Sequence, residues 1–424
     1  MDADVLDGWK RTRGIGPDPV HPAWEELLAA ARAHGDDVVD AALARAGGPL
    51  VSVDPDDDGK RLVTFVRRAP RATGVDLVGH PVHVDAAALT SGLLAGATRH
   101  RLPMHRAEGT GLWHRTFRVS PRLRTLYQYR THAGPARPEV IGFFDAETDP
   151  HNPRRFPPAQ PRHELPATRH SGVVESVLAL DQAPTHERWG PASASTPLAE
   201  TTFSGTILKR TRRVWAYVPD RAAGLVVLHD GQQWAAHTDL VDGLDRLIGN
   251  AHIPPVAVVM VEALRGEPDE LGVGEAFTRS IATELVPWVR ERWGLPDAAA
   301  RTIVAGQSWG GLNAVHSAMR HPEVFGNAIG QSGSYWHGQS ATGWDDYGHL
   351  MAEIATGARV DVAFALDVGS LEGDMVPASR HLRDVLVARG HHVDYREFEG
   401  CHSWACWEHS LLDALVAITA RWPR

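Results

Sequence analysis

The sequence predicts an α/β protein in which a doubly wound, mostly parallel sheet follows a small antiparallel β-sandwich. Three observations support this prediction. The chain has 424 residues, more than one hydrophobic core usually serves. Short strand-like segments separated by turn signals come first, and alternating strand and helix patterns follow. Apolar residues make up 43% of the chain and charged residues 22%, as in ordinary globular proteins.

The first unit is predicted from the spacing of apolar residues. Helical spacing between about 22 and 47 predicts a helical leader over residues 1–48. Residues 49–145 are predicted to form an immunoglobulin-like β-sandwich, because the β-branched and aromatic segments 62–66, 112–119 and 126–129 alternate with turns. Residues 146–195 are rich in proline, which fixes φ and removes a donor, so an extended connector is expected there.

Residues 196–424 are predicted to form the α/β unit. The apolar runs 225–228, 256–261, 302–305, 360–365 and 393–398 predict buried strands. Helices are predicted at 277–293 and around 411–418. Strands that alternate with helices imply a parallel sheet with helices on both faces.

Charge and targeting signals exclude several classes of protein. The formal net charge of −9 disfavours a nucleic-acid partner, which needs a basic face. No secretion signal is recognisable, and no apolar run approaches the roughly 18 residues of a membrane span. The two cysteines are too few for a disulfide framework and fit a reducing compartment. We therefore expect a cytoplasmic protein without a membrane partner.

A G-x-S-x-G motif at 306–310 lies directly after a predicted strand and directly before a helical run. This context is typical of the nucleophile elbow of the α/β-hydrolase fold, in which a tight turn lifts the serine above the sheet edge. The helix N-terminus that follows favours developing negative charge. The motif therefore predicts that Ser308 is the nucleophile of a serine hydrolase.

The base and the acid are predicted from their positions, because this fold orders the triad as nucleophile, acid and histidine. His402 follows the last predicted strand and precedes the final helix, where it can accept the serine proton. Glu372 stands after the preceding strand and is the first candidate to orient the histidine. Asp374 is the alternative acid, and Asp367 is a weaker competitor.

Two backbone amides are predicted to form the oxyanion hole. One belongs to Trp309, the residue after the nucleophile, and the other to Gln232 or Gly231 in the loop after the strand at 225–228. A serine mechanism needs no metal and no cofactor. Cys401 and Cys406 flank the predicted base, but three potential ligands in one short loop do not predict a metal site.

Several sequence blocks resemble the enterochelin (enterobactin) esterase family. They are HDGQQW at 229–234, AGQSWGGL at 305–312, QSGSYW at 331–336, GCH at 400–402 with CW at 406–407, and DPHNP at 149–153. The resemblance covers about residue 60 to the end. It implies a β-sandwich before an α/β-hydrolase unit, Glu372 as the triad acid, and hydrolysis of the trilactone backbone of a catecholate siderophore, which releases its iron.

The resemblance also implies a small-molecule ester partner, iron-loaded or iron-free, and a set of substrate-binding residues. These are Arg265, Glu270, Trp336, Trp404 and Trp407, with Trp309 beside the nucleophile. Pro268 and Gly274 depart from the family's pattern around Glu270. A thioesterase or depsipeptide hydrolase with the same triad is therefore the alternative, and a catalytically silent binding protein is a third hypothesis. The oligomeric state is left open.

Overall fold

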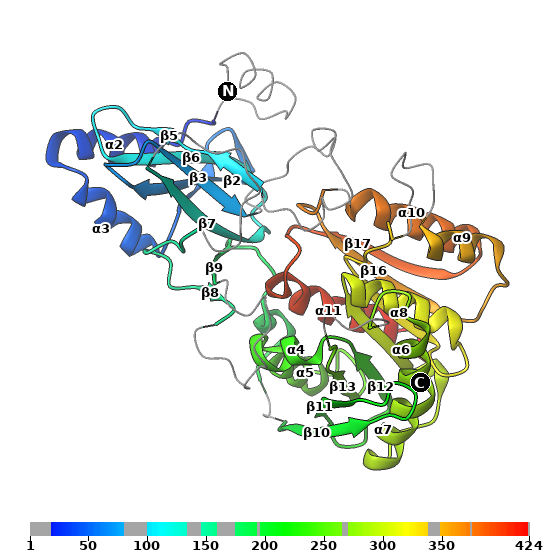
Figure 1. Cartoon of the computed structure of the whole chain (residues 1–424). Helices are drawn as coiled ribbons and strands as arrows, with labels where there is room; N and C mark the ends of the chain where they lie inside the picture. Colours follow the sequence, from blue (N-terminus) through cyan, green and yellow to red (C-terminus); the bar gives the residue numbers. More distant parts are fainter. Residues whose placement is uncertain are drawn as a thin grey trace.

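The computed structural model describes residues 18–79, 100–133, 146–158, 174–192, 196–264, 270–337, 348–373 and 375–422. Two packed sheets form the sandwich, and one larger sheet forms the α/β unit (Figure 1). This is the predicted fold class. No helix within the described ranges is long and apolar enough to cross a membrane.

The leader helices belong to the sandwich. Helices α2 (Pro22–His34) and α3 (Asp37–Ala46) bury Trp24, Leu28 and Val39 in one cluster with Val66 and Leu112 of the first sheet. Figure 1 shows these helices on the side of the sandwich away from the α/β unit. The first sheet has the order β1-β2-β6-β5, with β1 (Leu50–Asp54), β2 (Asp57–Arg68), β6 (Leu112–Val119) and β5 (His105–Arg106).

The second sheet has the order β4-β3-β7-β9-β8. Its strands are β4 (His100–Pro103), β3 (Gly74–Gly79), β7 (Arg124–His132), β9 (Glu175–Ala179) and β8 (Arg155–Phe156). Strands β8 and β9 lie in the segment that we expected to be an extended connector, so that expectation was wrong here. Buried hydrogen bonds attach this segment to Tyr127 of β7. The Tyr127 hydroxyl donates to Asp149 Oδ2 (2.7 Å) and accepts from Asn152 Nδ2 (3.0 Å), and all three side chains are buried. The proline content of the segment, on which the prediction of a connector rested, gives no sign of these buried hydrogen bonds.

The α/β sheet has the order β10-β11-β13-β12-β14-β15-β16-β17, and it is parallel from β13 onward. Its strands are β10 (Leu198–Ser204), β11 (Thr211–Tyr217), β12 (Gly224–Leu228), β13 (Val256–Val261), β14 (Thr302–Gln307), β15 (Asn327–Gln331), β16 (Ala363–Gly369) and β17 (His392–Phe398). The predicted strand at 360–365 thus begins three residues later, at Ala363.

Helices cover both faces of this sheet. One face packs against α6 (Glu275–Ser280), α7 (Val286–Trp293), α8 (Trp309–Arg320), α9 (His349–Thr356) and α10 (Met375–Ala388). The other face packs against α4 (Gly231–His237), α5 (Leu240–Gly249) and α11 (Trp404–Thr419). The predicted helix at 277–293 contains one π-helical segment, η4 (Ile281–Leu285), and the last helix begins seven residues earlier than predicted, at Trp404.

Candidate active site

Ser308 occupies the sharp turn between β14 and α8. Its backbone has φ 54° and ψ −117°, a conformation that costs free energy for a residue with a Cβ. The turn needs glycine at position 306, because a Cβ there would lie 2.3 Å from the carbonyl oxygen of Gly310. Three backbone hydrogen bonds, all of 3.0 Å, hold the strained residue: Ser308 N donates to Gln331 O, and Ser308 O accepts from Ser334 N and Leu312 N. The side chain therefore projects from a fixed position.

Glu372 and His402 follow neighbouring parallel strands, β16 and β17, at the same edge of the sheet. His402 Nδ1 lies 2.7 Å from Glu372 Oε2. The other carboxylate oxygen, Oε1, accepts from Ser332 Oγ (2.6 Å) and from Gly369 N (2.7 Å). Because the Glu372 side chain is fully buried, these donors leave it little freedom to rotate. The carboxylate can thus fix the orientation of the imidazole.

The two competing acids differ in position. Asp374 lies outside the described residues. Asp367 is buried beneath Glu372, where it accepts a bond from Gln331 Nε2 (3.2 Å). Burial, with the nearby Glu372 charge adding to it, raises the pKa of Asp367 to about 8, so this group is mostly protonated at pH 7. A neutral acid that contacts Gln331 instead of the histidine is poorly suited to orient the base.

Ser308 Oγ makes one long contact in the described part of the chain, 3.5 Å to Ser334 Oγ, and no hydrogen bond there joins it to His402. Bonds between nucleophile and base are often long until a substrate is bound. The His402 ring packs edge-to-face on Trp407, with centroids 4.7 Å apart at 81°. This contact limits rotation of the ring while 15% of its side chain stays exposed.

The residues predicted to form the oxyanion hole lie at helix N-termini. Trp309 is the first residue of α8, and Gly231 and Gln232 are the first two of α4. Amides at helix starts have no partner within the helix. The next two amides of α4, at Gln233 and Trp234, donate to Asp230 O. The Gln232 side chain is already bonded to the backbone of Ala263, so only its backbone N–H is suited to this role.

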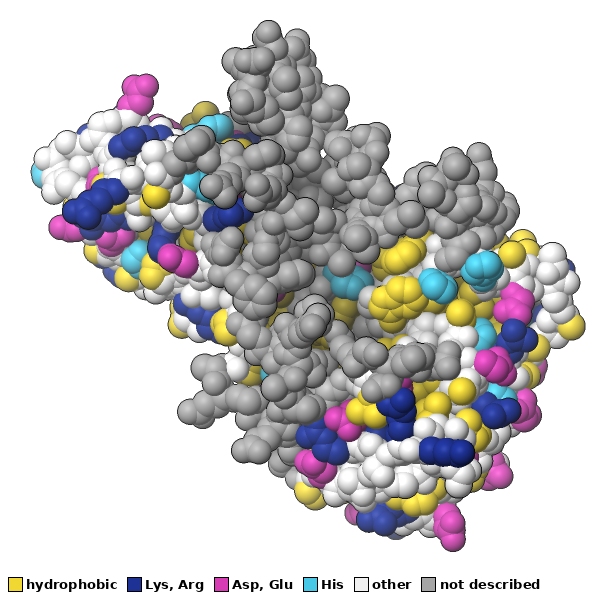
Figure 2. Space-filling model, in the orientation of Figure 1, with side chains coloured by type: hydrophobic (Ala, Val, Ile, Leu, Met, Phe, Trp, Pro, Cys, Tyr) yellow, Lys and Arg dark blue, Asp and Glu magenta, His cyan; other side chains and the backbone are white. Residues whose placement is uncertain are grey.

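Aromatic residues gather beside the nucleophile. The Trp309 side chain is 40% exposed, and its ring lies 5.7 Å from that of Trp336 and 4.9 Å from that of His337. Figure 2 shows hydrophobic and histidine side chains clustered on one face of the α/β unit. We call Trp309, Trp336 and His337 the aromatic platform. The rings meet edge-to-face, at 69° and 71°, and the exposed ring of Trp309 can hold an aromatic group of a substrate by stacking.

Three of the predicted substrate-binding residues make contacts within the protein. Trp407 is only 1% exposed and donates its indole N–H to Ser332 Oγ (2.9 Å), so it supports Glu372 indirectly. Glu270 forms a buried, bidentate ion pair with Arg212 at 2.8 and 3.0 Å. Trp404 packs on Trp407 with ring centroids 5.1 Å apart. Both side chains thus have partners within the protein, and their contact with a substrate stays a prediction. Arg265 lies outside the described residues.

Gln331 is a supporting residue that the sequence analysis did not single out. It ends β15, and its side-chain nitrogen lies within bonding distance of Ser410 Oγ (2.6 Å) and Trp407 O (3.1 Å) on α11, and of Asp367. Its backbone carbonyl accepts from Ser308 N. One buried residue therefore joins the nucleophile turn to the helix that follows the base. Ser332, which donates a hydrogen bond to Glu372, lies next to Gln331 in the QSGSYW block, but the spacing of these residues did not indicate that bond.

Two family models match the chain. The model named "Enterochelin esterase, N-terminal" matches residues 62–189, and the Esterase model matches residues 205–418, which is half of the chain. The chain belongs to the enterochelin esterase family. It is accordingly a carboxylic ester hydrolase, with the fold that the sequence predicts.

Several relatives in the enterochelin esterase family are similar over most of their length. An iron(III) enterobactin esterase of Dickeya dadantii is 27% identical over 402 residues, covering 88% of this chain and 90% of the relative. An iron(III) salmochelin esterase of Escherichia coli is 31% identical over 61% of this chain and 66% of the relative. The enterobactin esterase of Shigella flexneri, crystallised in the presence of 2,3-dihydroxy-N-benzoyl-serine, aligns with a TM-score of 0.69 at 25% identity, covering 89% of this chain and 98% of that one.

Proposed function

We propose that this enzyme hydrolyses the ester backbone of a catecholate siderophore of the enterobactin type, with Ser308, His402 and Glu372 as its catalytic triad. The observation that carries the proposal is the pairing of His402 with a buried, doubly hydrogen-bonded Glu372 at the sheet edge where Ser308 turns into α8. The enterobactin and salmochelin esterases among the relatives support the substrate class.

The proposed reaction follows from these positions. His402 Nε2 takes the proton of Ser308 Oγ as the oxygen attacks the ester carbonyl. The amides of Trp309 and of Gln232 or Gly231 donate to the oxyanion that develops. His402 then gives its proton to the leaving alkoxide, which departs as an alcohol and leaves an acyl group on Ser308. Water, deprotonated by His402, attacks this acyl-enzyme; His402 then returns the proton to Ser308 Oγ as the acyl–oxygen bond breaks and the acid is released. Glu372 stabilises the imidazolium in both halves.

The aromatic platform supports a substrate that carries catechol rings. Trp309 presents an exposed ring directly beside the nucleophile, and Trp336 and His337 extend that surface. Stacking there would place an ester carbonyl of the backbone near Ser308. Both cysteines are free thiols, which fits the cytoplasmic location that we propose with this function.

The substrate assignment is tested by competition. The enzyme is incubated with an equimolar mixture of iron(III) enterobactin, iron-free enterobactin, a feruloyl ester and a linear acyl thioester, and mass spectrometry follows each product. We expect dihydroxybenzoyl-serine products from enterobactin to form at least about 100-fold faster than products from the other two, because only enterobactin fills the platform while its ester reaches Ser308. Preferential cleavage of the thioester would contradict the siderophore assignment and leave the triad standing.

A further inference from the structure

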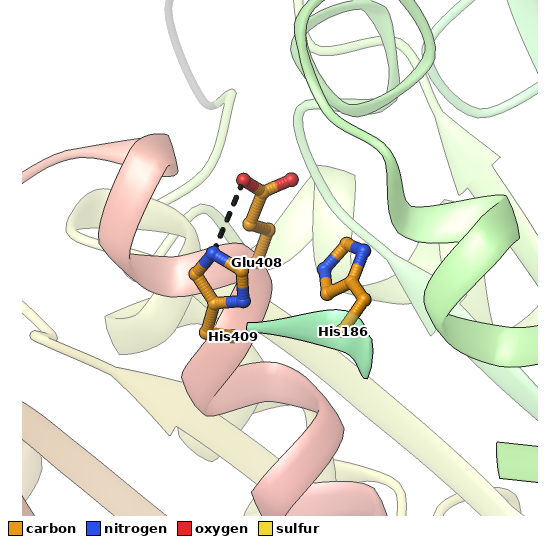
Figure 3. Close-up of side chains that lie close together, drawn as sticks. All are labelled: His186, Glu408 and His409. Atoms are coloured by element: carbon orange, nitrogen blue, oxygen red, sulfur yellow. Dashed lines mark ion pairs between the residues drawn. The ribbon is translucent and has the colours of Figure 1, made fainter. Parts of the chain in front are cut away.

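A second cluster of reactive side chains lies outside the proposed active site. His186 belongs to the 3-10 helix η3 (His186–Trp189), which enters the α/β unit, while Glu408 and His409 belong to α11. One potential ligand atom from each of the three residues lies within 4.8 Å of the other two. In Figure 3 the rings of His186 and His409 face one another, with the Glu408 carboxylate above them. Their ring centroids are 4.7 Å apart.

The spacing within this cluster suits a metal ion. His409 Nε2 lies 3.6 Å from Glu408 Oε1. Two ligands of a tetrahedral zinc ion, each bonded at about 2.0–2.1 Å, are separated by roughly 3.3 Å. Two imidazoles and one carboxylate form a ligand set that zinc and related divalent transition metals favour. Small side-chain rotations would bring the three donors to bonding distance.

The buried nitrogens provide an independent observation. The side chains of His186 and His409 are only 7% and 9% exposed, yet His186 Nε2 and His409 Nδ1 have no hydrogen-bond partner among the described residues. His186 Nδ1 faces Asp242 Oδ2 of α5 at 3.6 Å. A metal-bound histidine almost always directs its other nitrogen at a carboxylate or carbonyl in this way. Buried polar atoms without partners are costly, and a bound cation would satisfy at least the Nε2 of His186.

Burial and neighbouring charges act on both histidines of the cluster. Burial lowers the pKa of His409 well below its usual value, and the nearby Arg124, His186 and Arg188 lower it further. Burial likewise lowers the pKa of His186, against the opposing pull of Asp242 and Glu187. The cationic neighbours oppose a metal ion, but Arg188 is itself paired with Asp413 (2.9 Å), and Glu408 and Asp242 add negative charge.

We propose that His186, Glu408 and His409 bind a divalent transition-metal ion of the zinc class, with Asp242 supporting His186. The ion would join η3, which leads from the sandwich, to α11, whose first turn carries the residues that pack on His402. Its role is structural and separate from ester hydrolysis.

Metal titration of the untagged, full-length protein tests this proposal. The protein is dialysed against a chelator and then titrated with Zn²⁺ by calorimetry and with Co²⁺ by visible absorption. We expect one equivalent of either ion per chain, a rise in Tm on binding, and the absorption of a low-coordinate Co²⁺ site. His186→Ala and Glu408→Gln should each weaken binding by more than about 100-fold, and Asp242→Asn by about 10-fold.

Controls separate this site from the other histidines and from catalysis. His252→Ala removes an exposed histidine whose ring packs on Trp189 at the end of the same 3-10 helix, and it should bind metal as the wild type does. Removing the ion should lower Tm and leave kcat for an iron-free ester within about twofold at 25 °C. If the wild type fails to bind one equivalent, or if Glu408→Gln binds as tightly as the wild type, the proposal is overturned, whatever the outcome of the hydrolysis assays.

Discussion

Glu372 is set apart from the other acids near β16 by its hydrogen bonds. Its carboxylate meets His402 on one oxygen and two donors on the other, whereas Asp367 is held mostly protonated by burial. Its position in the sequence and the family resemblance already made Glu372 the first candidate for the acid. The hydrogen bond from Ser332 that gives Glu372 its fixed orientation joins residues 40 positions apart, so no local pattern revealed it.

Substitution of the acid tests this ranking. Glu372→Gln keeps the shape of the side chain but removes the charge that stabilises the imidazolium, so kcat should fall by about 10³–10⁴-fold. Asp374→Asn is the matched control and should change kcat by less than about threefold. Steady-state kinetics on one ester substrate decide between them. A larger loss in Asp374→Asn would transfer the role of the acid to that residue.

Trp309 has two separable contributions, because its amide and its ring are different groups. Trp309→Ala keeps the amide for the oxyanion and removes the exposed ring of the platform. We expect KM for a catecholate ester to rise about 3- to 10-fold, the value of one aromatic contact, with little change for an acetyl ester. An equal effect on both esters would assign the ring to packing instead of substrate binding.

At the scale of elements, the end of β15 connects the parts of the site. Gln331 contacts α11 through its side chain and the nucleophile turn through its carbonyl. Strands such as β12 and β13 were predictable because they are continuous apolar runs that are buried on both faces. Strand β15, with the sequence NAIGQ, was not predicted, because its polar ends and its glycine interrupt the apolar run that indicates a buried strand. All five of its residues are nonetheless buried. Tertiary packing decides such a segment.

Asp367 lies on β16, the strand next to β15, and it makes the free energy of unfolding depend on pH. Its pKa is raised from 3.8 to about 8 in the folded state, chiefly by burial. The folded state therefore binds more protons than the unfolded state between these values, so the stabilisation is fully present below about pH 4 and is lost as pH rises through about 8.

Asp367→Asn should remove this dependence, because an amide does not titrate. Urea unfolding at pH 5 and pH 8 gives the free energies of unfolding of both proteins. We expect the wild type to lose more stability than the variant between the two pH values. Parallel pH profiles for the two proteins would show that the Asp367 carboxyl does not titrate in this range.

At the scale of the whole molecule, one hydrophobic cluster crosses from the sandwich into the loop that carries the base. Leu126 and Tyr127 of β7 share it with Cys401 and Cys406 on either side of His402. The backbone continues the contact, since Arg124 N donates to Glu399 O (3.0 Å). The sequence indicated two units but could not show that they share a core. The burial of Trp407 and Glu270 was missed for the same reason, because burial arises from contacts between distant segments.

A shared core predicts that the two units unfold together. Scanning calorimetry should give one cooperative transition. Leu126→Ala opens a cavity in the shared cluster, so it should lower the Tm of that transition and reduce the free energy of unfolding by about 2–5 kcal/mol. Leu43→Ala, in the cluster of the leader helices, is the comparison on the far side of the sandwich. Two resolved transitions, of which Leu126→Ala shifts only the one belonging to the sandwich, would show that the units are energetically independent.

The central claim is that Ser308 is the nucleophile that opens the siderophore ester, and replacing it tests the claim most directly. Wild type and Ser308→Ala are incubated with iron(III) enterobactin, and mass spectrometry quantifies the dihydroxybenzoyl-serine products. Circular dichroism and quenching of tryptophan fluorescence confirm that the variant is folded and still binds the substrate. We expect a loss of at least about 10⁴-fold in kcat, with binding retained. A Ser308→Ala protein that hydrolyses the siderophore at a rate near that of the wild type would contradict the account.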